Sequence, residues 1–156
     1  MATHAIEKTE GWSLWKFAVG GAITGISAGI ANIFYVIIYS LVASDSGTYG
    51  VDTMSVTIFS FLPVLLSAFV YYGLYSINHQ TGTRNFIILG FILLVASLYG
   101  PFNPDSISNI LDGFNFKESL MLDGTITYFL LPMHLIAGFM ALYVLPKFVT
   151  AGNRAE

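Results

Sequence analysis

Charged residues are missing from four long stretches of the chain, and this absence constrains the fold more than any other feature. The intervals without Asp, Glu, Lys or Arg are Phe17–Ala43, Thr53–Thr83, Asn85–Pro104 and Gly124–Pro146. Each contains an apolar run of roughly 17–25 residues, the length that a helix needs to cross the ~30 Å hydrocarbon layer of a bilayer. The pattern predicts four transmembrane helices, at about 17–43, 54–77, 85–100 and 125–147.

The composition favours a membrane protein over a soluble one. Of the 156 residues 10% are charged, whereas soluble domains carry about 25%. Mean hydropathy is +0.72. A soluble protein with four buried helices is the alternative, but buried core helices are usually shorter and amphipathic. The expected fold class is all-α, a polytopic transmembrane four-helix bundle that forms a single membrane domain over residues 1–156.

Positive charge sets the predicted orientation of the bundle. With four spans both termini lie on one side, and that side holds five of the six Lys and Arg residues, namely Lys8, Lys16, Arg84, Lys147 and Arg154. Lys117 alone lies on the other side. Since Lys and Arg are enriched in cytoplasmic loops, we expect cytoplasmic termini in a multi-pass protein of the cell membrane.

Two further features are expected at the membrane surfaces. Amphipathic aromatic residues favour the headgroup level, and the predicted anchors are Trp12, Trp15, Tyr71, Tyr72 and Tyr75. The long outer loop, residues 101–124, joins the third and fourth helices and contains apolar residues near helical spacing. Loops of this length are often functional lids or else disordered, and we expect an ordered cap.

Small residues form a stripe on each of two predicted helices. In lipid, close packing of small residues and interhelical hydrogen bonds hold helices together. The stripes consist of Gly21, Gly25 and Gly29 on the first helix and of Gly138 and Ala141 on the fourth. If these helices pack antiparallel, small residues meet small residues, and Asn32 and His134 come to similar depth. A direct or water-bridged hydrogen bond between Asn32 and His134 is therefore predicted.

Polar residues of the other helices extend this site. Pro63 frees one backbone carbonyl, which needs a partner within a membrane. Ser60 and Ser67 flank it on a similar face, and the third helix offers Ser97. The sequence predicts a small polar pocket in an apolar bundle, somewhat toward the outer side, formed by Asn32, Ser60, Pro63 and His134.

Among the Asp, Glu, Lys, Arg and His side chains, His134 is the one that lies well inside a predicted span. Such residues are functional candidates by default, and three roles are open: a structural hydrogen bond, ligand binding or proton handling, and metal or haem ligation. No carboxylate or second histidine shares its depth, so neither metal nor cofactor is expected. We also find no nucleophile–base pair, phosphate loop or dinucleotide fingerprint. The expectation is a protein that is not an enzyme and has no nucleic-acid partner.

Three short motifs carry a resemblance over nearly the whole chain. They are "AGIANIFY" with Asn32, "SLYGPF" with Ser97 and Pro101, and "LPMHLIAGF" with Met133 and His134. In these motifs the chain resembles uncharacterised prokaryotic families of four-helix integral membrane proteins. The resemblance implies the same four-helix fold and a pairing of Asn32 with His134. It implies no activity and no substrate.

Three functions fit these observations. The first is a non-enzymatic integral membrane protein that binds a small ligand or a partner around the Asn32/His134 pocket. The second is an accessory subunit of a larger membrane complex, in which the glycine stripe faces another protein. The third is an oligomeric channel or transporter with His134 as a gate. The expected partners are the lipid bilayer and a membrane protein or further copies of this chain.

Overall fold

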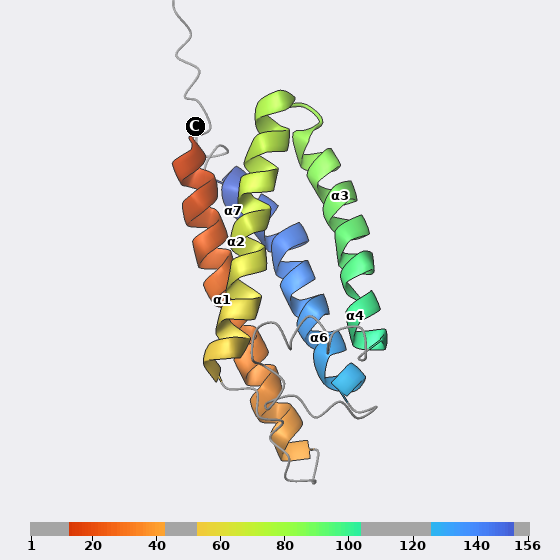
Figure 1. Ribbon diagram of the computed structural model, residues 1–156. Helices are drawn as coiled ribbons and strands as arrows, with labels where there is room; N and C mark the ends of the chain where they lie inside the picture. The colour runs from red at the N-terminus through yellow and green to blue at the C-terminus, as the bar shows by residue number, and fades with distance from the viewer. Residues whose placement is uncertain (1–12, 43–52, 104–125, 152–156) are drawn as a thin grey trace, which may run out of the picture.

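The computed structural model describes residues 13–42, 53–103 and 126–151, and all regular secondary structure in these ranges is helical. The first two helices are α1 (Leu14–Val42) and α2 (Thr53–Ile77). The third span is α3 (Gly82–Ser97), continued by the short α4 (Tyr99–Phe102). The fourth consists of α6 (Ile126–Phe139), the π-helical turn η2 (Met140–Val144) and α7 (Leu145–Ala151) (Figure 1).

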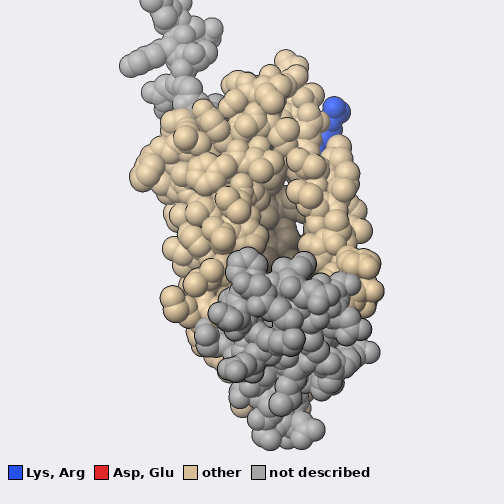
Figure 2. Space-filling model, viewed as in Figure 1, with Lys and Arg blue, Asp and Glu red and all other residues tan. Residues whose placement is uncertain are grey.

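Four helical segments are long and apolar enough to cross a membrane: Leu14–Val42, Thr53–Ile77, Gly82–Phe102 and Phe129–Thr150. This confirms the all-α fold and the four apolar helices predicted from the charge-free intervals. Large hydrophobic side chains are exposed along all four segments, and Figure 2 shows a described surface on which one basic patch interrupts the uncharged residues. The outer cap predicted over 101–124 lies, from residue 104 onward, outside the described residues, as does Trp12.

The fourth span departs from the single α-helix that was predicted. Leu145 donates its backbone N–H to the carbonyl of Met140, five residues earlier, which defines the wide π turn. Pro146 follows directly, and a proline has no N–H for the carbonyl of Leu142 and would crowd it in a regular helix. Widening the helix just before Pro146 relieves that conflict, and π turns of this kind are often found at functional sites.

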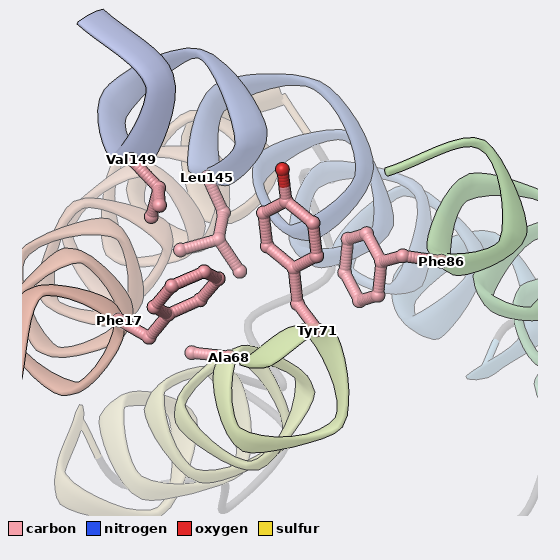
Figure 3. Close-up of a cluster of buried hydrophobic side chains, with 6 residues drawn as sticks. All are labelled: Phe17, Ala68, Tyr71, Phe86, Leu145 and Val149. Carbon is pink, nitrogen blue, oxygen red and sulfur yellow. The ribbon is translucent and has the colours of Figure 1, made fainter. Parts of the chain in front are cut away.

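One end of the bundle is held by a buried cluster to which all four spans contribute. Figure 3 shows it around Tyr71 of α2, with Phe17, Ala68, Phe86, Leu145 and Val149. The ring of Tyr71 stacks on Phe86 of α3 at a centroid distance of 4.5 Å and meets the edge of Phe17 at 5.1 Å. Its hydroxyl lies 2.8 Å from the Thr83 hydroxyl. Stacked and edge-on aromatic pairs add to the stabilisation that burial provides.

The sequence predicted that Tyr71 is an interfacial anchor. Its side chain is instead fully buried in this cluster. Its neighbours Tyr72 and Tyr75 are partly buried and pack against the same cluster. Trp15 is 75% exposed, which leaves its ring free to contact lipid. The aromatic residues near the α2–α3 turn thus serve packing at least as much as anchoring.

The opposite end has a smaller cluster that does not include α3. Its buried members are Val56 of α2 and Phe129 and Met133 of α6, and side chains of α1 pack against them. The third span is therefore fixed to the bundle core near the α2–α3 turn, and Figure 1 shows α3 diverging from α2 toward α4. Among the described residues of α3, Gly82 and Phe86 are the buried ones.

The glycine stripe of α1 packs against α2, not against the fourth span as predicted. A Cβ atom on Gly21 would lie 2.5 Å from the Cβ of Ala68, and one on Gly25 would lie 2.9 Å from the Phe61 ring. A Cβ on Gly29 would lie 3.4 Å from the Thr57 side chain, an ordinary van der Waals distance. The adjacent helix in the chain takes the close contact because α1 and α2 lie side by side along most of their length (Figure 1).

In the fourth span, Gly138 packs against α3. A Cβ on Gly138 would lie 2.6 Å from Leu94, and Gly90 of α3 receives the side chain of Leu142 in return. The two helices interlock through these reciprocal leucine-into-glycine contacts. Near the other end of the fourth span, Gly20 of α1 accommodates Val149, so the contact between the first and fourth spans uses a glycine outside the predicted stripe.

We expect Gly21→Ala to destabilise the protein, because its methyl group would force α1 and α2 apart at Ala68. Overpacking of this kind costs about 1–3 kcal/mol of unfolding free energy. Thermal unfolding in a nonionic detergent measures the loss. Gly73→Ala is the matched control, since nothing lies within 4 Å of a Cβ at Gly73. Equal unfolding temperatures for the two variants would contradict the tight α1–α2 contact.

Candidate functional site

A cavity of about 620 Å³ lies between α2, α3 and α6, and Asn32 of α1 contributes to its wall. Pockets that hold small ligands usually measure about 300–1,000 Å³ and are mostly apolar. Leucine, valine, phenylalanine and small residues dominate this wall; its polar members are Asn32, Ser55, Ser60, Ser67, Ser97 and His134. Figure 2 shows the molecule hollowed between the column of α1 and α2 and the column of α3.

The cavity exists because α3 is tied closely to α2 at one end only. At the turn, a Cβ on Gly82 would lie 2.5 Å from the Cα of Tyr75, so backbone approaches backbone there. Phe86 is buried one turn later and also forms part of the cavity wall. Beyond that point α3 separates from α2, and buried Pro101 of α4 lines the cavity at the far end.

Asn32 is the most buried polar residue of the cavity wall, with 1% of its surface exposed. Its Nδ2 donates to the Ser60 hydroxyl at 2.7 Å and to the Met133 carbonyl at 3.4 Å. The amide therefore connects α1, α2 and α6. Its Oδ1 is buried and accepts no hydrogen bond from any described residue. A buried acceptor without a donor costs about 1–3 kcal/mol, so this oxygen is a candidate contact for a bound molecule.

His134 is partly buried in the cavity wall and bonds within its own helix. Its Nδ1 lies 3.0 Å from the Leu130 carbonyl. Since a carbonyl only accepts, the bond assigns the proton to Nδ1 and leaves Nε2 of the neutral ring as an acceptor. No described residue donates to that second nitrogen.

The predicted direct hydrogen bond between Asn32 and His134 is not formed. The Asn32 amide contacts the backbone of Met133, the residue before His134, and turns its Nδ2 to Ser60. The close α1–α2 contact instead brings the Ser60 hydroxyl to 2.7 Å from the amide nitrogen. The two residues still form part of the same cavity wall.

The predicted pocket residues lie at similar depth. Asn32 comes ten residues before Val42, Ser60 seven residues after Thr53, and His134 eight residues after Ile126. At about 1.5 Å per residue, they lie roughly 10–15 Å inside the end of the bundle where α6 begins. Pro63, one turn deeper on α2, is also part of the wall, as are Gly138 and Ala141 of the predicted stripe.

Two buried polar groups were not predicted from the sequence. The Met133 carbonyl accepts from Asn32, and no side-chain pattern could have indicated a backbone group. Thr24 of α1 is 1% exposed, and its hydroxyl has no partner among the described residues, but it is not part of the cavity wall. A threonine between glycines on the packed face of a helix was the available signal.

The cavity wall is mostly apolar and carries few polar groups. Among the described residues that line it, none is Asp, Glu, Lys or Arg, and within the described ranges no three His, Cys, Asp or Glu side chains are grouped to hold a metal ion. What the wall offers is apolar surface, a small set of hydrogen-bonding groups and one histidine. These are the properties of a site for an apolar molecule with a polar end.

We expect Ser60→Ala to lower the unfolding free energy by about 1–3 kcal/mol, because the buried Asn32 amide loses its shortest hydrogen bond. Thermal unfolding in detergent measures this loss. Ser27→Ala is the control, since the exposed Ser27 hydroxyl bonds only the Ile23 carbonyl of its own helix, at 2.9 Å. If both variants unfold at the same temperature, the Asn32–Ser60 bond does not stabilise the bundle.

Comparisons of this chain with protein-family models, with curated proteins and with solved structures give no match.

Proposed function

We propose that this protein is a non-enzymatic, multi-pass membrane protein that binds a small apolar or weakly polar molecule in the cavity between α2, α3 and α6. The observation that carries the proposal is the cavity itself, about 620 Å³ in volume, with apolar walls and an unpartnered buried Asn32 oxygen. A molecule that fills it would contact the wall residues that α3 does not reach. Its polar end would lie at the depth of Asn32 and His134.

Entry from the lipid phase is supported by the residues at the edge of the cavity. Phe59 of α2 and Leu93 of α3 both line it, and they are 54% and 57% exposed. The cavity is therefore bordered by side chains that contact the surroundings of the bundle as well as its interior. A ligand dissolved in the bilayer would enter between α2 and α3 without crossing water.

We propose further that both termini and the α2–α3 turn face the cytoplasm and that the bilayer is the cell membrane. Support comes from the described cations: Lys16 is in the first turn of α1, Arg84 in the first turn of α3 and Lys147 in α7. Figure 1 shows the start of α1, the α2–α3 turn and α7 at the same end of the bundle. Lys147 lies over the ring of Tyr143 at 3.8 Å, an arrangement that suits a cation near a membrane surface. The described ranges contain no acidic residue.

Filling the cavity should displace its ligand. We expect Ala137→Phe, which places a ring in the cavity wall, to lower several-fold the amount of any molecule that is enriched over bulk lipid during purification. The measurement is lipid and metabolite mass spectrometry of protein extracted in its native membrane with a copolymer. Leu135→Phe is the matched control, since Leu135 is on the same helix, 46% exposed and outside the cavity wall.

Two outcomes would overturn the proposed binding function. If the wild-type protein enriches no molecule, or if both variants retain the same molecule in the same amount, the cavity is not its binding site. A native mass that shows stable association with a different membrane protein, unchanged by Ala137→Phe, would favour an accessory subunit instead.

The orientation is testable with single cysteines, because the natural chain has none. We expect Gln80→Cys, in the exposed α2–α3 turn, to react with a membrane-impermeant maleimide only after the cells are broken. Ser46→Cys, in the segment between the first two spans, should react in intact cells. Labelling of Gln80→Cys in intact cells would reverse the proposed topology.

A further inference from the structure

Three serine hydroxyls of the cavity wall donate their protons to backbone carbonyls of their own helices. Ser60 donates to the Val56 carbonyl, Ser67 to the Val64 carbonyl and Ser97 to the Leu94 carbonyl, each at 2.7 Å. A serine hydroxyl has one proton, so after this bond it retains only acceptor capacity. All three therefore present oxygen lone pairs, and no free O–H, to a molecule in the cavity.

The two larger polar side chains of the wall, Asn32 and His134, also present hydrogen-bond acceptors to the cavity. Both N–H groups of the Asn32 amide point to acceptors of the protein, Ser60 and the Met133 carbonyl, and the unpartnered atom is its Oδ1. The Nδ1 of His134 is engaged by the Leu130 carbonyl, which leaves Nε2 as an acceptor. The polar part of the wall formed by these groups thus accepts hydrogen bonds and offers none.

Charge restricts the ligand further. Among the described lining residues no carboxylate is available to neutralise a cationic head, and no Lys or Arg to neutralise an anionic one. Burying an unpaired ion in an apolar environment costs far more than burying a neutral group. The complement of this cavity is accordingly a neutral molecule that donates a hydrogen bond.

The cavity also has length. On α2 its wall runs from Ser55 to Val70, and the part from Ser60, beside Asn32, to Val70 spans ten residues or roughly 15 Å along the helix axis. Toward Val70 the wall includes Phe86 of α3. An elongated apolar chain fits this direction, with its polar end at Asn32 and His134.

Resting on the proposed function, we infer that the ligand is a neutral lipid alcohol: an elongated hydrocarbon whose hydroxyl donates to Asn32 Oδ1 or His134 Nε2. A ketone, ester or ether of the same skeleton brings only acceptors to an acceptor wall. Such a molecule would leave the Asn32 oxygen unpaired and is selected against.

A matched pair of probes tests this inference: farnesol, an isoprenoid alcohol, and farnesyl methyl ether, which has the same chain without the O–H. Binding to the purified full-length protein in nonionic detergent is followed by the rise in unfolding temperature with probe concentration. We expect the ether to bind about tenfold more weakly than the alcohol, as the loss of one hydrogen bond to a buried acceptor predicts.

Substitutions in the cavity wall identify the side chains that cause the preference for the alcohol over the ether. Asn32→Leu should abolish the selectivity for the alcohol while the ether still binds, whereas Thr24→Val, which removes a buried hydroxyl outside the cavity, should keep it. If Asn32→Leu does not fold, His134→Phe replaces it, and the selectivity should then fall severalfold. Selectivity unchanged in whichever of these two cavity variants is measured would overturn the inference.

The two proposals fail separately. Equal binding of farnesol and its ether to the wild-type protein overturns the alcohol inference but leaves a binding cavity. Binding of neither probe, together with no enriched molecule in the native extract, overturns the proposed function as well. Stronger binding of the ether would likewise overturn the alcohol inference, since the O–H would then add nothing to binding.

Discussion

The close contact between α1 and α2 determines how the rest of the bundle is arranged. Gly21 and Gly25 bring α1 so near to α2 that a single added carbon would collide with Ala68 or Phe61. In lipid this proximity is what holds two helices together, since apolar side chains contact the bilayer as favourably as they contact one another. The contact also sets Asn32 against Ser60, which makes the amide a crosslink instead of a free polar group.

The other two spans fill the remaining space unequally. The fourth span packs against α1 at both clusters, while α3 shares in the cluster around Tyr71 and interlocks with the fourth span through Gly90 and Gly138. Three helices thus form the compact part of the bundle, and α3 closes a space that it does not fill. The cavity is a consequence of that geometry, and its polar groups come from the three compact helices and from Ser97 of α3.

The four helices could be predicted from the sequence because a membrane-spanning helix must have a certain length and lack charged residues. Both properties are visible directly in the order of the residues. The sequence also predicted that Asn32, Ser60, Pro63 and His134 lie in one region, since their distances from the helix ends fix their depth. It could not predict which helices touch. Gly21 and Gly138 both carry the signature of close packing, but the signature does not name the partner, and here the partners are Ala68 and Leu94. Tyr71 was misassigned for a related reason, because an aromatic residue near a helix end has the same spacing whether it faces lipid or Phe86.

Specificity in such a site has to come from its polar groups. Lipid acyl chains would compete for a cavity that borders a bilayer, so an apolar ligand would exchange one hydrocarbon contact for another and gain little. A hydrogen bond to a buried acceptor is different, because no acyl chain can supply the donor and the unpaired oxygen costs free energy until one arrives. Asn32 Oδ1 is such an acceptor, held in place by two bonds from its own nitrogen to other helices. The bonds that rigidify the bundle therefore also orient a buried acceptor by which the cavity would distinguish the proposed ligand from lipid.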